Sequence, residues 1–367
     1  MTATLPRRGA VSAGAGAPAP RHRVVRPGPV RLEGGALLDP EVSLRTWGAP
    51  AAPDGSNVVV VLHALTGDSH VGGPGGPAHC PRGWWPDLIG PGRPLDTRRL
   101  HVVAPDVLGG CSGTTGPASP APDGRRWGSR FPAVTVRDQV AVEVAAVRAL
   151  GLRRVGYVLG ASAGGMRALE WGLQREVEAG HLCVVAAPAV ASADLRGGLA
   201  LQRQAVTADP AWRGGDHPSG AGPVAGLALA RRMAMLTYRS ADGLEERFGE
   251  GSPGTCASGG SVTAWLDHHG DSFVRRFDAG AYLALIDAMA SHDVGRGRGG
   301  VPAALAAVHA RVTAVGVSSD RLVRPEEVRR VAALAGGRYL QVESASGHDG
   351  FLTETEAVAG LLGSVLA

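Results

Sequence analysis

The chain has 367 residues, of which 44% are hydrophobic and 19% charged, and its net charge is only +4. This length allows one large core with an insertion, and no run approaches the ~18–20 apolar residues needed to span a bilayer. All 37 of its Lys and Arg residues are arginine, which excludes a P-loop lysine, a Schiff-base lysine and a lysine general base. Its few aromatic residues and scattered charge argue against nucleic acid as a partner.

Residues 1–28 are rich in Ala, Gly, Pro and Arg and lack the apolar region of a secretory signal. Prolines argue against an amphipathic transit helix, so we predict a disordered N-terminal extension and a cytoplasmic protein. The cysteines have no paired spacing, which predicts neither a disulfide framework nor a metal site. They stand at Cys80, Cys111, Cys183 and Cys256.

Apolar strands alternate with helical or loop stretches over residues 29–190, as in the first part of an α/β core with a doubly wound, mostly parallel sheet. The predicted strands cover 57–62, 101–104, 154–159 and 182–187. Residues 191–300 instead predict only helices, at 199–206, 226–236, 262–266 and 279–291. Strands return at 312–317 and 338–343, within a second core part over 301–367. The helical insertion is predicted to be a lid that excludes water, and the Gly/Arg run 295–300 to return the chain to the core.

The motif Gly160-Ala161-Ser162-Ala163-Gly164 follows one of these strands and precedes a helix-compatible stretch. This order is typical of a nucleophile elbow, in which small neighbours permit a sharp turn and the serine hydroxyl projects above the sheet. A G-x-S-x-G motif also arises by chance in a chain with 55 glycines. The strand–turn–helix setting favours the functional interpretation.

Two further residues stand where an α/β-hydrolase fold carries its acid and its base, in the chain order Ser, acid, His. Asp320 follows the strand at 312–317, and His348 follows the strand at 338–343. Taken alone, Asp320 could cap a helix and His348 could be a loop histidine. All three at strand ends in this order predict a catalytic triad of Ser162, Asp320 and His348.

An oxyanion hole is predicted from the backbone N–H groups of Leu65 and Ala163. Leu65 follows the buried strand 57–62, and Ala163 follows the nucleophile. His63, at the end of the same strand, is interpreted as a buried histidine with satisfied hydrogen bonds rather than a catalytic group.

Nine stretches together resemble the homoserine O-acetyltransferase family of the α/β-hydrolase superfamily, in particular its actinobacterial branch. They are 62–70, 108–117, 130–138, 164–171, 230–238, 276–282, 291–300, 319–322 and 347–352. The resemblance covers the chain from about residue 30 to its end, and the stretches in the helical insertion are more specific than G-x-S-x-G.

This resemblance implies acetyl transfer from acetyl-CoA, as a co-substrate, to the side-chain hydroxyl of L-homoserine, an early step of methionine synthesis. It implies that Arg231 clamps the substrate α-carboxylate, that Tyr238 assists and that Asp349 holds the α-ammonium group. No permanently bound cofactor is expected, and a homodimer formed through the lid helices is implied. Without the resemblance, Arg231 would be interpreted as a solvated charge on a helix face.

The sequence departs from the family pattern at Ala163, where a larger residue is usual, and at Asp106, where an asparagine is usual. Relatives with the same triad acylate serine, use succinyl-CoA or acetylate a cephalosporin alcohol, so a secondary-metabolic O-acyltransferase is an alternative. An esterase or thioesterase that passes the acyl group to water is an alternative of another class. The predicted pair Arg231 and Asp349 separates them, because an esterase needs no clamp for an amino acid.

Overall fold

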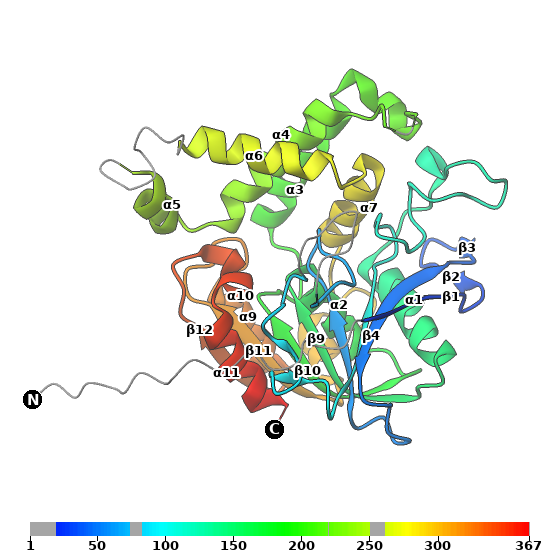
Figure 1. Cartoon of the computed structure of the whole chain (residues 1–367), viewed down its shortest axis with the longest axis vertical. Helices are drawn as coiled ribbons and strands as arrows, with labels where there is room; N and C mark the ends of the chain where they lie inside the picture. The colour runs from blue at the N-terminus through cyan, green and yellow to red at the C-terminus, as the bar shows by residue number, and fades with distance from the viewer. Residues whose placement is uncertain (1–19, 74–82, 219, 250–260, 367) are drawn as a thin grey trace, which may run out of the picture.

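An eight-stranded sheet forms the centre of the computed structural model, which describes residues 20–73, 83–218, 220–249 and 261–366 (Figure 1). The strand order is β1-β4-β8-β5-β9-β10-β11-β12; β4 pairs antiparallel with both β1 and β8, and all the other neighbouring strands pair parallel. The strands are β1 Arg21–Val25, β4 Val42–Gly48, β5 Val58–Leu62, β8 His101–Pro105, β9 Arg154–Ala161, β10 Glu178–Val185, β11 Arg311–Val317 and β12 Arg338–Val342. Two small sheets pair β2 Val30–Arg31 with β3 Leu37–Leu38 and β6 Ile89–Gly90 with β7 Leu95–Asp96.

Helices cover both faces of the sheet, which explains the continuous apolar run of β5. Val58, Val60 and Leu62 pack in the same cluster as residues of α1 and α2, whereas Val59 and Val61 pack in the cluster that contains α11. A strand buried on both faces cannot alternate apolar and polar residues. These outer helices are α1 Val136–Ala149, α2 Ala163–Trp171, α8 Val301–Ala306, α9 Pro325–Leu334, α10 Gly350–Thr353 and α11 Thr355–Val365.

Residues 191–300, called the helical segment below, lie between β10 and β11, and their described part contains helices and no named strand. Its helices are α3 Ala193–Thr207, α4 Val224–Tyr238, α5 Ala241–Phe248, α6 Val262–Val274 and α7 Ala279–Ala290, with a short 3₁₀ stretch, Pro210–Gly215, after α3. The four predicted helices are present, and α5 was not predicted. Figure 1 shows α3, α4, α5 and α6 gathered above the sheet. Within the described ranges, no helix combines the length and apolar character needed to cross a bilayer.

The predicted disordered extension is wrong at its C-terminal end. Residues 21–25 form β1, which pairs antiparallel with β4 from Arg21 opposite Thr46 to Val25 opposite Val42. An edge strand is held by backbone hydrogen bonds on one side, so it needs few buried side chains, and four of its five residues are exposed. Residues 21–25 therefore lack the apolar pattern that would predict a strand. The remaining part, residues 1–19, lies outside the described residues.

Candidate active site

Ser162 lies at the sharp turn between β9 and α2. Its backbone has φ of 56° and ψ of −121°, a strained conformation for a residue other than glycine. A Cβ on Gly160 would lie 2.0 Å from the carbonyl oxygen of Gly164, and a Cβ on Gly164 would lie 2.1 Å from that of Leu62. Both contacts are too short for any side chain, so the flanking glycines are required by the close packing of β9, α2 and β5.

Ser162, His348 and Asp320 form a continuous hydrogen-bonded array. The Oγ of Ser162 lies 2.7 Å from Nε2 of His348, and Nδ1 of His348 lies 2.6 Å from Oδ2 of Asp320. All three residues are buried, with at most 5% of their surface exposed. The sequence placed these residues at three strand ends, and the fold brings them into contact in the predicted order.

Backbone groups fix the orientation of the acid. The N–H groups of Leu322 and Val323 each donate to Oδ1 of Asp320 at 2.9 Å, which leaves Oδ2 for His348. Burial lowers the pKa of His348, but the Asp320 carboxylate, by its charge and its hydrogen bond, and the charge of Asp349 together outweigh burial and raise this pKa above its ordinary value. The array therefore favours a positively charged imidazole more than burial alone would allow.

A cavity of about 670 Å³ opens beside Ser162 under the helical segment. Leu65, residues of α3, Tyr238 and Met289 line it. To judge from the hydrogen bonds among the described residues, the backbone N–H groups of Leu65 and Ala163 donate to no protein acceptor. Leu65 also lines the cavity beside Ser162, and Ala163 is the first residue of α2. The oxyanion hole formed by these two N–H groups stays a prediction.

Arg231 and Tyr238, both on α4, lie close to this array. The Cζ atom of Arg231 is 5.5 Å from the ring centroid of Tyr238, and that ring is 5.9 Å from the ring of His348. Arg231 also lies over the ring of Phe273. Its Nη1 atom is buried and has no hydrogen-bond partner among the described residues. A buried guanidinium nitrogen without a partner destabilises the unliganded protein, and an anionic ligand could supply the missing acceptor.

Asp349 is held by an arginine that sequence reasoning missed. Nη2 of Arg239 lies 3.3 Å from Oδ2 of Asp349, and both side chains are mostly buried. Burial raises the pKa of Asp349, while the charge of Arg239 opposes this shift. Arg239 directly follows Tyr238 but leaves the helix with extended backbone, so helical periodicity gives no signal for it. Its position directly after the family-like stretch 230–238 was the available signal.

The departure at Asp106 lies in a polar network behind the loop that carries Leu65. Oδ1 of Asp106 accepts from the N–H of Ser69 at 2.6 Å, and Oδ2 accepts from the hydroxyl of Ser43 at 2.6 Å. Burial raises the pKa of Asp106 to about 6. The carboxyl group therefore anchors this loop to β4.

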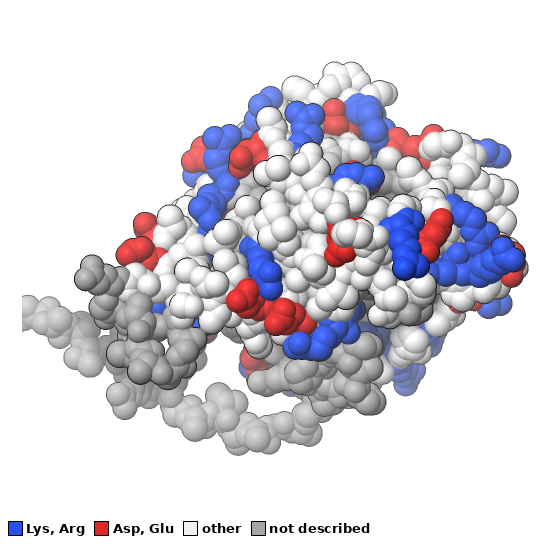
Figure 2. All heavy atoms as spheres, turned by 90° about the horizontal axis from the view of Figure 1, so that it is seen from above, with Lys and Arg blue, Asp and Glu red and all other residues white. Residues whose placement is uncertain are grey.

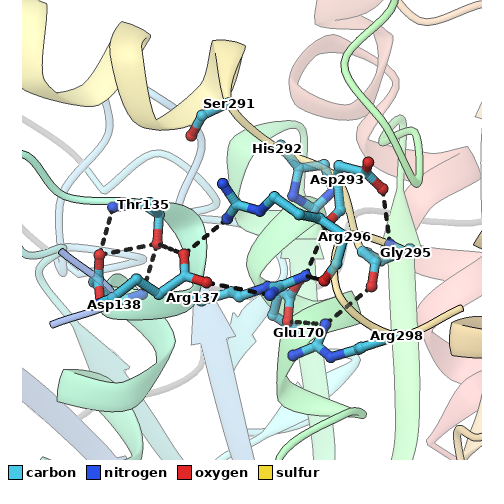
Figure 3. Close-up of polar contacts among 12 residues, drawn as sticks. Thr135, Arg137, Asp138, Glu170, Ser291, His292, Asp293, Gly295, Arg296 and Arg298 are labelled. Carbon is cyan, nitrogen blue, oxygen red and sulfur yellow. Dashed lines mark hydrogen bonds and ion pairs between the residues drawn. The ribbon is translucent and has the colours of Figure 1, made fainter. Parts of the chain in front are cut away.

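Several family-like stretches meet in a polar cluster (Figure 3). Arg137 on α1 donates to Glu170 at 3.2 Å and to the carbonyl oxygens of Asp293 at 3.0 Å and Arg296 at 2.6 Å. Arg298 completes the cluster with a 2.7 Å ion pair to Glu170. The Gly/Arg run therefore returns the chain to the core, as predicted, and is fastened to α1 and α2 by these contacts.

Comparison with known proteins shows the family of this chain. The α/β-hydrolase-fold family profile matches residues 57–355. A homoserine O-acetyltransferase of Clavibacter michiganensis is 51% identical over 353 residues, which cover 92% of this chain and 90% of the relative. The chain belongs to the homoserine O-acetyltransferase family. The predicted actinobacterial likeness and α/β-hydrolase fold are thereby confirmed, and the chain is an acyltransferase-family enzyme.

Solved structures share the fold without separating transferases from hydrolases. A homoserine O-acetyltransferase from Bacillus anthracis has a TM-score of 0.83 at 23% identity, covering 95% of this chain and 97% of that one. Esterase E22 has a TM-score of 0.84 at 24% identity, covering 95% of this chain and 100% of that one. At these identities the likeness extends to the fold alone.

Proposed function

We propose that this enzyme transfers an acetyl group from acetyl-CoA to the side-chain hydroxyl of L-homoserine through an acetyl ester on Ser162. The observation that carries the proposal is the buried Ser162–His348–Asp320 array at the floor of a cavity. Full-length similarity to homoserine O-acetyltransferases supports the choice of acceptor.

In the first half-reaction the Oγ of Ser162 attacks the thioester carbonyl while Nε2 of His348 takes the serine proton. The N–H groups of Leu65 and Ala163 stabilise the negative oxygen of the tetrahedral intermediate. The C–S bond then breaks, His348 gives its proton to the leaving thiolate, and CoA departs. In the second half-reaction His348 takes the proton of the homoserine hydroxyl, whose oxygen attacks the ester carbonyl, and the proton returns to Ser162.

Acceptor recognition is assigned to the charged groups around Tyr238. The unpaired Nη1 of Arg231 supplies donors for the α-carboxylate, with the hydroxyl of Tyr238 assisting. Asp349 receives the α-ammonium group, and Arg239 holds the Asp349 carboxylate in place beforehand. Clamping both ends of the amino acid places its hydroxyl for attack, where effective molarities can reach about 10⁵–10⁸ M.

The helical segment is proposed to act as a lid. Residues of α3 and the end of α4 line the cavity over Ser162, so they separate the acetyl ester from bulk water. This separation matters because water competes with homoserine for the same ester.

A homodimer formed through the helical segment is also proposed. Apolar side chains are exposed on its helices, at Leu201, Val224, Leu229, Leu236 and Val262. Figure 2 views the molecule from this side, and uncharged surface separates its scattered acidic and basic groups. A cytoplasmic enzyme of methionine synthesis is the corresponding biological role.

A screen of donors against acceptors tests the proposed reaction. Acetyl-CoA and succinyl-CoA are each combined with homoserine, serine, deacetylcephalosporin C or water alone, and free CoA is measured. We expect the fastest release with acetyl-CoA and homoserine. Preference for another pair would move the enzyme to a related O-acyltransferase activity. Equal release with and without an acceptor would make it a thioesterase.

A further inference from the structure

The peptide unit between Ala64 and Leu65 carries one of the two proposed oxyanion donors, and its carbonyl is firmly held. The oxygen of Ala64 lies 2.7 Å from Nδ1 of His63 and accepts the N–H of Gly67 at 2.9 Å. No peptide bond of the described chain is cis, so the carbonyl and the N–H of this unit point in opposite directions. Fixing the Ala64 oxygen therefore fixes the direction of the Leu65 N–H.

The partners of His63 define its protonation state. The N–H of Val107 points at Nε2 at 3.2 Å and can only donate, whereas the Ala64 oxygen can only accept. Both bonds form only when the ring is neutral and carries its proton on Nδ1. The ring is 2% exposed. Burial, followed by the charge of Arg167, lowers its pKa to about 3, so the neutral form persists throughout the working range.

Arg167 holds the preceding peptide unit from the helix behind the nucleophile. Its Nη2 donates to the carbonyl oxygen of His63, and its Nη1 pairs with Glu143 of α1. Glu143 in turn accepts from Nε1 of Trp171 at 2.9 Å. Two successive carbonyls of the loop are thus fastened, one by Arg167 and one by the His63 ring.

We propose that His63 is a positioning residue for acyl transfer, whose Nδ1–H holds the Ala64–Leu65 peptide so that the Leu65 N–H faces the developing oxyanion. Arg167 supports it by anchoring the adjacent carbonyl. His63 touches neither substrate nor Ser162 in this scheme and acts through the peptide. The inference rests on the proposed acyl-enzyme function.

Two amide substitutions separate the two nitrogens of the ring. In His63→Asn the amide nitrogen is bonded to Cγ, as Nδ1 is, and can still donate to the Ala64 oxygen. In His63→Gln the amide lies one carbon further out and can serve the Val107 N–H but not the Ala64 oxygen. Deleting a whole oxyanion donor costs about 10²–10³ in turnover. We expect His63→Gln to lower kcat about 10–10²-fold with KM nearly unchanged, and His63→Asn to stay within about threefold of wild type.

His181→Gln serves as the matched control, because it removes another buried imidazole, bonded to Thr313 on the sheet. It should change kcat little. A His63→Gln enzyme that keeps wild-type kcat, or an Asn variant as impaired as the Gln variant, would overturn the inference. If wild-type Ser162 is never acetylated, the proposed function fails first, and that is a distinguishable result.

A second measurement needs no active variant. The ¹⁵N spectrum of histidine-labelled wild-type protein should contain a ring that stays neutral with its proton on Nδ1 between pH 5 and 8, and this signal should vanish in either folded His63 variant. A His63 ring protonated on Nε2, or one that titrates in this range, would contradict the proposed role.

Discussion

The array at the strand ends and the buried arginines of the helical segment differ in whether their polar atoms have hydrogen-bond partners. At the strand ends, both carboxylate oxygens of Asp320 and both ring nitrogens of His348 have protein partners. On the helical segment, Nη1 of Arg231 and Nε of both Arg232 and Arg239 are buried without hydrogen-bond partners among the described residues. Arg232 and Arg239 each form an ion pair with a carboxylate, with Asp267 and Asp349 respectively. An unpaired buried polar group destabilises the folded protein by about 1–3 kcal/mol. Such a group is therefore expected mainly where binding a ligand requires it.

This difference indicates that the two regions have different roles in the reaction. The array at the strand ends is assembled before any substrate arrives, as expected for proton transfer and attack. Nη1 of Arg231 is left without a protein partner among the described residues and can be completed by a ligand, as expected for acceptor recognition. Substitutions in the array at the strand ends should therefore impair both half-reactions, whereas substitution of Arg231 should impair only acyl transfer to the acceptor.

The largest effect is expected from Asp320→Asn, which tests the strand-end side of the comparison. Loss of the carboxylate removes the group that orients His348 and stabilises its charged form, so kcat should fall by about 10⁴.

The acid limb of the rate profile reports the pKa of His348, which Asp320 raises. In wild type, activity should therefore decline as pH falls through a value above 6.5, because protonated His348 cannot accept the serine proton. In the variant this limb should move to lower pH. A loss below tenfold would assign the acid role to another carboxylate.

Arg231→Ala tests the other side. Loss of hydrogen bonds to a charged group typically costs about 1.5–3 kcal/mol, so use of homoserine should weaken about 10–10²-fold. Acetylation of Ser162 by acetyl-CoA should proceed almost unchanged, with slow hydrolysis continuing. Pre-steady-state measurement of both half-reactions gives this comparison.

Arg232→Ala is the matched control for Arg231→Ala. Arg232 is the next residue on α4, but its charge is balanced by ion pairs with Asp267 at 3.1 Å and Asp271 at 3.7 Å, so its removal should leave both half-reactions intact. If Arg231→Ala slows both half-reactions equally, Arg231 is a structural or CoA-binding residue, and the two regions do not have the different roles inferred above.

The smallest effect concerns stability. The pKa of Asp106 is raised by burial to about 6 from 3.8 in the unfolded chain, so the folded state binds this proton more tightly. The contribution is fully present below the unfolded pKa and is lost as pH rises through the folded pKa. Wild type therefore loses stability between about pH 4 and 7, whereas Asp106→Asn has no titrating group at this position and does not. The Tm of the variant minus that of wild type should increase over this range, by an amount that corresponds to about 1–3 kcal/mol in the free energy of unfolding. A difference in Tm that does not vary with pH would contradict this account.

The sequence predicted most of the sheet and the strand-end array because both follow from local patterns. Buried parallel strands have continuous apolar runs, and Ser162, Asp320 and His348 directly follow such runs. β1 was missed because an exposed edge strand needs only backbone pairing. Arg239 was missed because its ion pair with Asp349 joins residues far apart in the chain. Such long-range polar contacts depend on how the helical segment packs on the core, which periodicity does not encode.

The most direct test of the central claim is the mass of Ser162-containing peptides from enzyme mixed with acetyl-CoA alone and then chased with homoserine. We predict an added acetyl group on Ser162 that persists without acceptor and is discharged rapidly when homoserine is added, with O-acetylhomoserine as the product. Ser162→Ala should carry no such group and should release no CoA above background. An enzyme that makes O-acetylhomoserine without acetylating Ser162, or a Ser162→Ala variant with near-normal activity, would contradict the account.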